Sequence, residues 1–276
     1  MAPLPFPQID PVIFSLGPFH VRWYGLMYVL GFPASYYLVR HQLRQFRPAR
    51  LAENFEHLNV LLILAVIVGG RLGYVLFYNL GYYLDNPLEI PATWSGGMSF
   101  HGACLTLIVV GFLYCRKKSV DFWQAADLYT ATVPIGIGLG RIGNFINGEL
   151  FGRVTAMPWG MVFPDGGPSP RHPSQLYEAV LEGLLLFLLL WSVRHKPWQQ
   201  VRSWPHGSIL ALFLAGYGCM RIIAEMFREP DPQLGFLFNL LTMGQLLSMA
   251  MVAAGASIWL LRRRSVHGGA IAAKGR

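Results

Sequence analysis

Apolar runs of about twenty residues recur along the whole chain, and this recurrence limits the possible folds more than any other feature. A helix of that length is needed to cross the roughly 30 Å hydrocarbon core of a bilayer. Only 13% of the 276 residues are charged, whereas soluble domains average about 25%. The sequence therefore predicts an all-α, polytopic integral membrane protein, with residues 1–276 forming a single transmembrane helical domain.

The spacing of the apolar runs predicts seven transmembrane helices. The expected spans are about 21–40, 57–79, 98–115, 123–146, 174–193, 207–227 and 238–261. Of the 22 Lys and Arg residues, 15 follow the odd-numbered spans. Because basic loops stay in the cytoplasm, we expect a periplasmic N-terminus and a cytoplasmic C-terminus. The two long loops, at about 80–97 and 147–173, are then periplasmic. Loops of this length are often lids or binding segments, or disordered.

The formal net charge of +8 would also suit a nucleic-acid-binding protein, but the loop positions of the basic residues favour a role in topology. We therefore expect no nucleic-acid partner.

Cys104, Cys115 and Cys219 lie in or beside apolar runs without metal-ligand or paired spacing, so we interpret them as helix-packing residues. No basic region precedes the first span, so we expect no cleavable signal peptide.

Arg141 lies in the fourth apolar run, inside a glycine-rich stretch that ends in a polar loop. A guanidinium group at membrane depth costs from about 2.5 to more than 10 kcal/mol, so it needs a reason. Asn144 lies three residues further on the same helix face, and Asn147 and Glu149 lie near the expected helix end. The glycines also match GxGxxG, but no strand precedes them, so a dinucleotide site is rejected. Close helix packing at the Gly136–Gly140 step is the alternative explanation.

The sixth span carries a polar stripe in which Tyr217, Arg221 and Glu225 follow at intervals of four residues, with Arg228 three residues later. Side chains at these intervals share one helix face. One reading is an ion pair that holds helices together, and the other is that Glu225 orients Arg221 toward an anion. Arg141 favours the second reading, because two guanidinium groups with one nearby acid leave positive charge uncompensated. The planar guanidinium group of arginine can donate two parallel hydrogen bonds to one phosphate group.

His101 opens the third span and is the best candidate for a general base, because an imidazole has an unperturbed pKa near 6.5. A hydrogen bond to a neighbouring carbonyl is the alternative explanation for this residue. His20 and His172 lie in loops and are weaker candidates. Tyr24 lies at the start of the first span, where it is either part of an aromatic belt or part of a site.

The fifth span presents Gln175, Glu178 and Glu182 on one face. These acids are equally well explained as counter-ions or as catalysts, and their candidate partners are Arg71, Arg141 and Arg221. Ser174 is a candidate N-cap for this span, although Tyr177 stands where a capping box has Glu.

Residues 140–153, with the sequence GRIGNFINGELFGR, are similar to the signature of bacterial prolipoprotein diacylglyceryl transferases. Further similar segments follow the family order and cover nearly the whole chain: 10–14, 22–27, 70–74, 97–102, 171–178 and 216–221.

The resemblance implies an enzyme that moves the diacylglyceryl group of phosphatidylglycerol onto the lipobox cysteine of a prolipoprotein, forms a thioether and releases glycerol phosphate. It also implies seven spans in the bacterial inner membrane, an active site toward the periplasm, and no metal or cofactor. Arg141 and Arg221 match essential positions of the family. The further matching positions are Tyr24, His101, Asn144, Glu149 and Tyr217.

From these residues we predict a division of roles. Arg141 and Arg221 hold the phosphate, and His101 takes the thiol proton, although arginine and tyrosine groups are alternative organisers of the thiolate. Asn144, with Asn147 or Tyr24, positions the glycerol, and Glu225 and Glu149 orient the cations. Two other classes compete with an enzyme: a lipid transporter whose path is lined by buried charges, and an assembly protein in which every ion pair is structural.

Overall fold

The computed structural model of the chain describes residues 4–7, 9–17, 19–93, 96–201, 203–229 and 241–274. Most of these residues are helical, as expected. The chain folds as two compact units, one formed by residues 1–42 with 126–276 and the other by residues 43–125. The expectation of one transmembrane domain over residues 1–276 stays a prediction.

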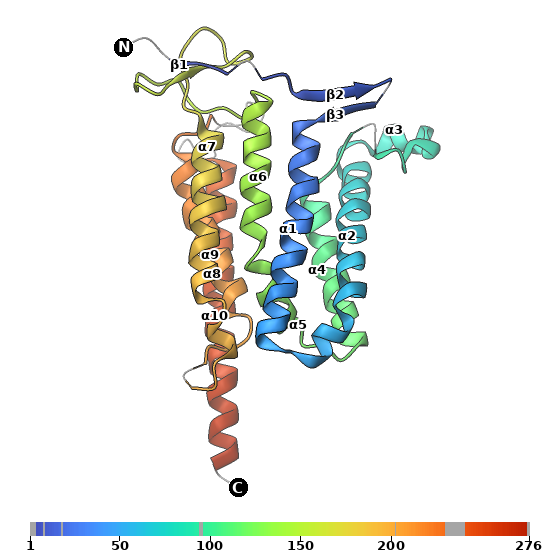
Figure 1. The fold of residues 1–276 in the computed structure, drawn as a ribbon, viewed down its shortest axis with the longest axis vertical. Coiled ribbons are helices and arrows are strands. Elements are labelled where there is room, and N and C mark those ends of the chain that lie inside the picture. The colour runs from blue at the N-terminus through green and yellow to red at the C-terminus, as the bar shows by residue number, and fades with distance from the viewer. Residues whose placement is uncertain are drawn as a thin grey trace. The chain divides into compact units, whose positions relative to one another are not determined.

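In the first unit, α6 (Val133–Ile146) packs against α7 (Ser174–Glu178) and the π-helical segment η3 (Ala179–Leu185) (Figure 1). Helix α9 (Ser208–Glu225) runs beside α10 (Met243–Lys274). The remaining helices that include residues of this unit are α1 (Trp23–Phe46), α5 (Phe122–Thr130), α8 (Leu186–Val193) and η4 (Lys196–Trp198).

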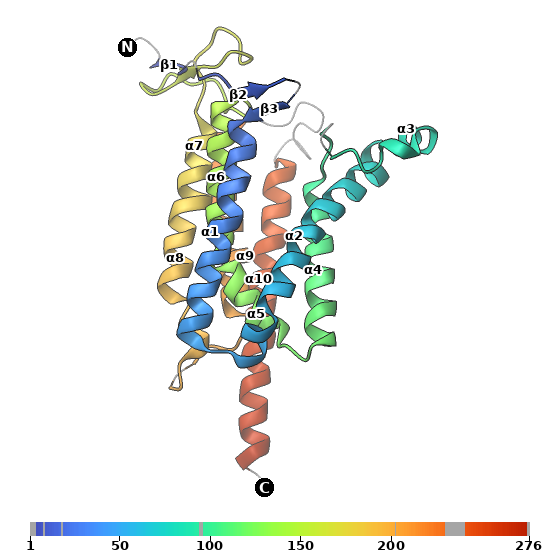
Figure 2. The same ribbon diagram turned by 45° about the vertical axis from the view of Figure 1, so that its right-hand side comes forward.

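The second unit is built on α2 (Ala49–Tyr78) and α4 (Phe100–Lys117), which lie side by side. A Cβ on Gly73 would lie 2.7 Å from the Cα of Gly102, so only glycine permits this helix contact. Between the two helices come the short helix α3 (Leu80–Asp85) and the 3₁₀ turn η1 (Pro87–Glu89). Figure 2 shows α3 turned away from the axis of α2.

Short strands modify the all-α prediction. β2 (Val12–Leu16) and β3 (Phe19–Arg22) form an antiparallel hairpin that leads directly into α1. β1 (Leu4–Pro5) pairs in parallel with β4 (Met161–Val162) from the second long loop. Backbone N–H and C=O groups need hydrogen-bond partners, and these strands supply them outside the helices, in the N-terminal segment and in the second long loop.

Within the part of the chain that the structure describes, five helical stretches are long and apolar enough to cross a membrane: Ala49–Tyr78, Phe100–Lys117, Ser174–Trp198, Ser208–Glu225 and Met243–Ser265. They coincide with the second, third, fifth, sixth and seventh predicted spans, except that residues 238–240 lie outside the described residues. The first predicted span corresponds to α1, whose apolar run is interrupted by Pro33 and four tyrosines. The fourth is divided at Ala131 and Thr132 into α5 and the 14-residue α6. A polytopic membrane protein fits these helices, and the number seven stays a prediction.

Two glycines bring α6 and η3 into close contact. A Cβ on Gly183 would lie 2.6 Å from the Cα of Gly138, so the two backbones touch. The predicted step of Gly136 and Gly140 contributes less, because a Cβ on either would have no neighbour within 4 Å. The contact at Gly138 brings the polar residues of α6 close to those of α7 and η3.

Asp127 of α5 fixes the start of α9 from outside that helix. Its carboxylate is buried and accepts hydrogen bonds from the backbone N–H groups of Gly207 at 2.8 Å, Ile209 at 2.9 Å and Leu210 at 3.1 Å. The first N–H groups of a helix have no partner inside the helix, and a carboxylate there also interacts favourably with the helix dipole. Asp127 therefore holds the helix that carries Arg221.

The three cysteines are free thiols in different surroundings. Cys115 is buried in α4, as expected of a packing residue, and Cys104 is partly buried. Cys219 is exposed on α9, so the packing interpretation is wrong for this residue.

Candidate active site

Two arginines from different helices meet at one glutamate in the first unit. Arg141 Nε lies 2.7 Å from Oε2 of Glu178, and Arg221 Nη1 lies 3.0 Å from the same oxygen. The contact joins α6, α7 and α9. The predicted convergence of the two guanidinium groups is thus present within one unit of the structure.

Two further glutamates contact these arginines. Glu182 in η3 lies 3.5 Å from Nη2 of Arg141 and 3.4 Å from Nη1 of Arg221. Glu225 lies 2.8 Å from Nη2 of Arg221 and accepts a hydrogen bond of 3.1 Å from the hydroxyl of Thr242. Both Nη atoms of Arg221 are therefore engaged by carboxylates.

Arg228, just beyond α9, completes the group, with Nη1 3.5 Å from Oε1 of Glu178. We call the whole set the charged cluster: Arg141, Arg221, Arg228, Glu178, Glu182 and Glu225. Three arginines face three glutamates, so the formal charges balance. Ion pairs with low exposure need this compensation because an unpaired charge is costly to bury.

The expectation of uncompensated positive charge is therefore wrong. It counted one acid near the two arginines, whereas Glu178 and Glu182 of the fifth predicted span also face them. The same contacts show that these two acids are counter-ions of Arg141 and Arg221. The ion pairs do join helices, as the structural reading of the stripe proposed.

A second polar group forms where α6 ends. Gly148 has a φ of 69°, the left-handed conformation with which glycine commonly ends a helix. The chain then turns so that Glu149 Oε1 accepts hydrogen bonds from the amides of Asn144 at 2.8 Å and Asn147 at 3.2 Å. Gln175 Nε2 donates to the backbone oxygen of Glu149 at 2.6 Å. The prediction that Glu149 orients a guanidinium group is wrong among the described residues, because asparagine amides hold its carboxylate.

The two predicted tyrosines lie on helices next to these groups. Tyr24 packs against α6, since a Cβ on Gly143 would lie 2.9 Å from its ring, and its hydroxyl lies 3.1 Å from that of Tyr28. Tyr217 lies one turn before Arg221 on α9 and stacks on Phe213, with ring centroids 5.8 Å apart.

His101 and Arg71 belong to the second unit. The ring of His101 is exposed near the start of α4 and meets the ring of Phe100 edge to face. Arg71 is buried and donates to four backbone oxygens of the loop after α3, those of Glu89, Ile90, Gly96 and Gly97. Arg71 is thus bound to loop carbonyls and is no partner of Glu178 or Glu182. The role of His101 stays a prediction.

The second long loop packs aromatic side chains just before α7. Trp159 Nε1 donates to the hydroxyl of Tyr177 at 2.7 Å, and this hydroxyl lies 3.0 Å from Nδ1 of His172. Burial lowers the pKa of His172, which favours its neutral form. Ser174 does not cap the helix as predicted, because its hydroxyl donates to the backbone oxygen of Leu150 instead.

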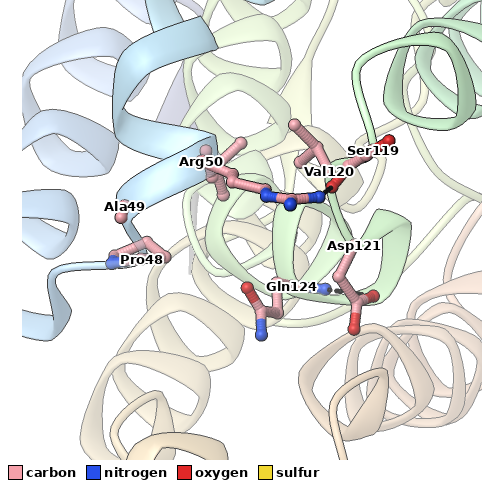
Figure 3. A pocket seen from close by; sticks show the side chains of 8 residues that line it. Pro48, Ala49, Arg50, Ser119, Val120, Asp121 and Gln124 are labelled. Atoms are coloured by element: carbon pink, nitrogen blue, oxygen red, sulfur yellow. Dashed lines mark hydrogen bonds between the residues drawn. The ribbon is translucent and has the colours of Figure 1, made fainter.

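A hollow of about 370 Å³ lies in the second unit, between the start of α2 and the loop before α5 (Figure 3). Arg50 extends along it and donates to the backbone oxygen of Ser119 at 3.1 Å. Asp121 accepts from the backbone N–H groups of Trp123 and Gln124 at the start of α5. None of the predicted site residues lines this hollow.

Sequence reasoning missed the central place of Glu178 and the contribution of Arg228. The available signal was the presence of two polar stripes, one on the fifth predicted span and one on the sixth, whose opposite charges suit each other. Among the described residues, no group of three or more His, Cys, Asp and Glu side chains is arranged to hold a metal ion.

The apolar helices are long enough to span a membrane, and they carry the charged cluster and the group of Asn144, Asn147 and Glu149. These features are those of an integral membrane protein with a polar site on its helices. Paired guanidinium groups are well suited to phosphate, and amides and phenols to hydroxyl groups. The chain belongs to the prolipoprotein diacylglyceryl transferase family, whose model matches residues 11–261.

Similar proteins carry the same description. The chain is 62% identical to a phosphatidylglycerol–prolipoprotein diacylglyceryl transferase of Desulfotalea psychrophila over 256 residues, which cover 93% of this chain and 94% of that protein. It is 51% identical to a protein of the same name from Geobacter sulfurreducens over 259 residues, which cover 94% of this chain and 97% of the relative.

Proposed function

We propose that the chain transfers the diacylglyceryl group of phosphatidylglycerol to the lipobox cysteine of prolipoproteins, the first step of bacterial lipoprotein maturation. The observation that carries this proposal is the 62% identity, over 93% of the chain, to a protein named for this transfer. The charged cluster supports it, because paired arginines are suited to a phosphodiester headgroup.

We also propose that the protein spans the bacterial inner membrane seven times, with its active site toward the periplasm. The alternation of basic residues supports this topology. Helix α1 and the α5–α6 pair would supply the two spans beyond the five apolar helical stretches. The N-terminus would then be periplasmic and the C-terminus cytoplasmic.

In the proposed site, Arg141 and Arg221 hold the phosphate of the lipid. Their glutamate partners restrict the orientation of both guanidinium groups, which keeps the donors in place before the lipid arrives. Asn144, with Asn147 or Tyr24, positions the glycerol, and Tyr217 lies one turn before Arg221 on the same helix.

The proposed reaction is a substitution at carbon. The cysteine sulfur forms a bond to the diacylglycerol carbon that carries the phosphate, the C–O bond at that carbon breaks, and glycerol phosphate leaves with the electron pair. A free thiol has a pKa near 8.5, so little of it is thiolate at neutral pH. His101 would take its proton. The two arginines would stabilise the charge on the departing phosphate.

The test is to incubate the purified protein with phosphatidylglycerol labelled in its acyl chains and a peptide with a lipobox cysteine. We expect label on the cysteine as a thioether and release of glycerol phosphate. A matched peptide with Ser in place of that Cys should stay unlabelled. Movement of intact lipid without peptide labelling would contradict the proposal and indicate a transporter.

Replacing His101 with Gln should slow the transfer and leave lipid binding intact, because Gln keeps hydrogen bonding but cannot accept the thiol proton. The rate should depend on pH in the unsubstituted protein, as general-base catalysis requires, and this dependence should change in the variant. The measurement is the pH dependence of kcat/KM for both proteins. An identical profile in both would contradict the role of His101 as base.

A further inference from the structure

Glu178 is the one glutamate, among the described residues, that contacts all three arginines of the charged cluster. Its Oε2 lies 2.7 Å from Nε of Arg141 and 3.0 Å from Nη1 of Arg221, and its Oε1 lies 3.5 Å from Nη1 of Arg228. Glu182 contacts two of the arginines at longer distances of 3.5 and 3.4 Å, and Glu225 contacts Arg221.

The shared oxygen of Glu178 limits the separation of the two arginines. With distances of 2.7 and 3.0 Å to one atom, Nε of Arg141 and Nη1 of Arg221 cannot be more than 5.7 Å apart. Guanidinium groups this close can donate to different oxygens of a single phosphate.

The carboxylate of Glu178 is more deeply buried than the two guanidinium groups that it contacts. The side chain of Glu178 is 1% exposed, compared with 19% for Arg141 and 12% for Arg221. The arginines therefore have surface left for a ligand, and the carboxylate has almost none. Glu178 also lies directly before the π-helical segment η3, a kind of helix distortion that is frequent at functional sites.

We propose that Glu178 is a positioning residue that sets the spacing of Arg141 and Arg221 for one phosphate group. The inference rests on the proposed function, since it assigns the phosphate to the same arginines. Glu178 acts through the guanidinium groups and does not touch the lipid. Arg228 holds the second carboxylate oxygen and so restrains its rotation.

The test compares Glu178→Gln with Glu225→Gln, a matched change at a glutamate that contacts one arginine of the cluster. Gln keeps the shape of Glu178 but loses its negative charge. It also replaces one carboxylate oxygen by an NH2 group, which cannot accept from a guanidinium group, so the contact with Arg228 or the contact shared by Arg141 and Arg221 is lost. We expect kcat to fall about 100-fold in Glu178→Gln, the typical effect of a small misplacement of positioning groups. Phosphatidylglycerol should bind about tenfold more weakly, with unchanged binding of diacylglycerol, which lacks the phosphate. The loss in Glu225→Gln should be smaller.

Three results would overturn the inference. Tighter phosphatidylglycerol binding in Glu178→Gln would show that the carboxylate competes with the phosphate. Equal weakening of phosphatidylglycerol and diacylglycerol binding would show a purely structural ion pair. Glu178→Asp keeps the charge and shortens the side chain, and it serves as the second variant if the Gln variant does not fold. Full activity of Glu178→Asp would show that the charge matters and the spacing does not. Failure of the unsubstituted protein to transfer lipid would instead contradict the proposed function.

Discussion

Replacing Arg221 with Lys is expected to lower kcat/KM for the transfer by about 100- to 1,000-fold, the typical effect of losing a donor that stabilises transition-state charge. Arg221 uses Nη1 for Glu178 and Glu182 and Nη2 for Glu225. A lysine has one nitrogen and no planar fork, so it cannot keep these contacts and also present a donor to phosphate. The measurement is the rate of peptide labelling at several lipid concentrations.

The matched control is Arg40→Lys, which makes the same substitution on α1, where Arg40 donates to the hydroxyl of Tyr36 at 3.4 Å. We expect its activity to stay within about twofold, because exposed interactions of this kind contribute little. Arg141→Lys should resemble Arg221→Lys, since Arg141 uses Nε and Nη2 for Glu178 and Glu182. Near-normal transfer in either cluster variant would contradict the phosphate role of that arginine.

Replacing Asp127 with Asn is expected to lower the free energy of unfolding by about 2–4 kcal/mol, because a buried carboxylate that accepts hydrogen bonds from three N–H groups would become an amide with a single acceptor oxygen. The helix it caps carries Arg221, so the activity should also be lost at a lower temperature. The measurement is Tm in detergent, together with residual activity after heating.

Asp121→Asn provides the comparison for this effect. Asp121 caps α5 through the N–H groups of Trp123 and Gln124 from an exposed position. The loss of such a cap typically costs about 1 kcal/mol. Equal Tm values for the two variants would show that the contact between Asp127 and α9 adds nothing beyond an ordinary cap.

Bilayer physics explains which helices could be predicted. The second, third, fifth, sixth and seventh predicted spans correspond to helical stretches of sufficient length, because an apolar run has to be long enough to cross the lipid core. The break at Ala131 and Thr132 has no such signal, since apolar residues continue on both sides of it. The β2–β3 hairpin was not predicted because its strands are too short to form an apolar run. Their pairing rests on backbone hydrogen bonds, which leave no pattern in the sequence.

The meeting of Arg141 and Arg221 could be predicted because a guanidinium group in an apolar helix needs an anionic partner, and two such groups can share one anion. The choice among their candidate partners stayed open, since spacing defines the face of a helix but not the helix opposite it. Arg71 shows this limit clearly. It has the same apolar surroundings in the sequence as Arg141, yet it binds loop carbonyls 18 to 26 residues away, which carry no sequence signal.

The most direct test of the central claim is to measure ¹⁵N–³¹P distances by solid-state NMR between arginine side chains and phosphatidylglycerol bound to the protein. We expect Arg141 and Arg221 both to lie within about 4 Å of one phosphorus atom, since charge-assisted hydrogen bonds to phosphate oxygens are about 2.7–2.9 Å long. The two signals should disappear one at a time in Arg141→Lys and Arg221→Lys. A lipid phosphate near neither arginine, or near only one of them, would contradict the account.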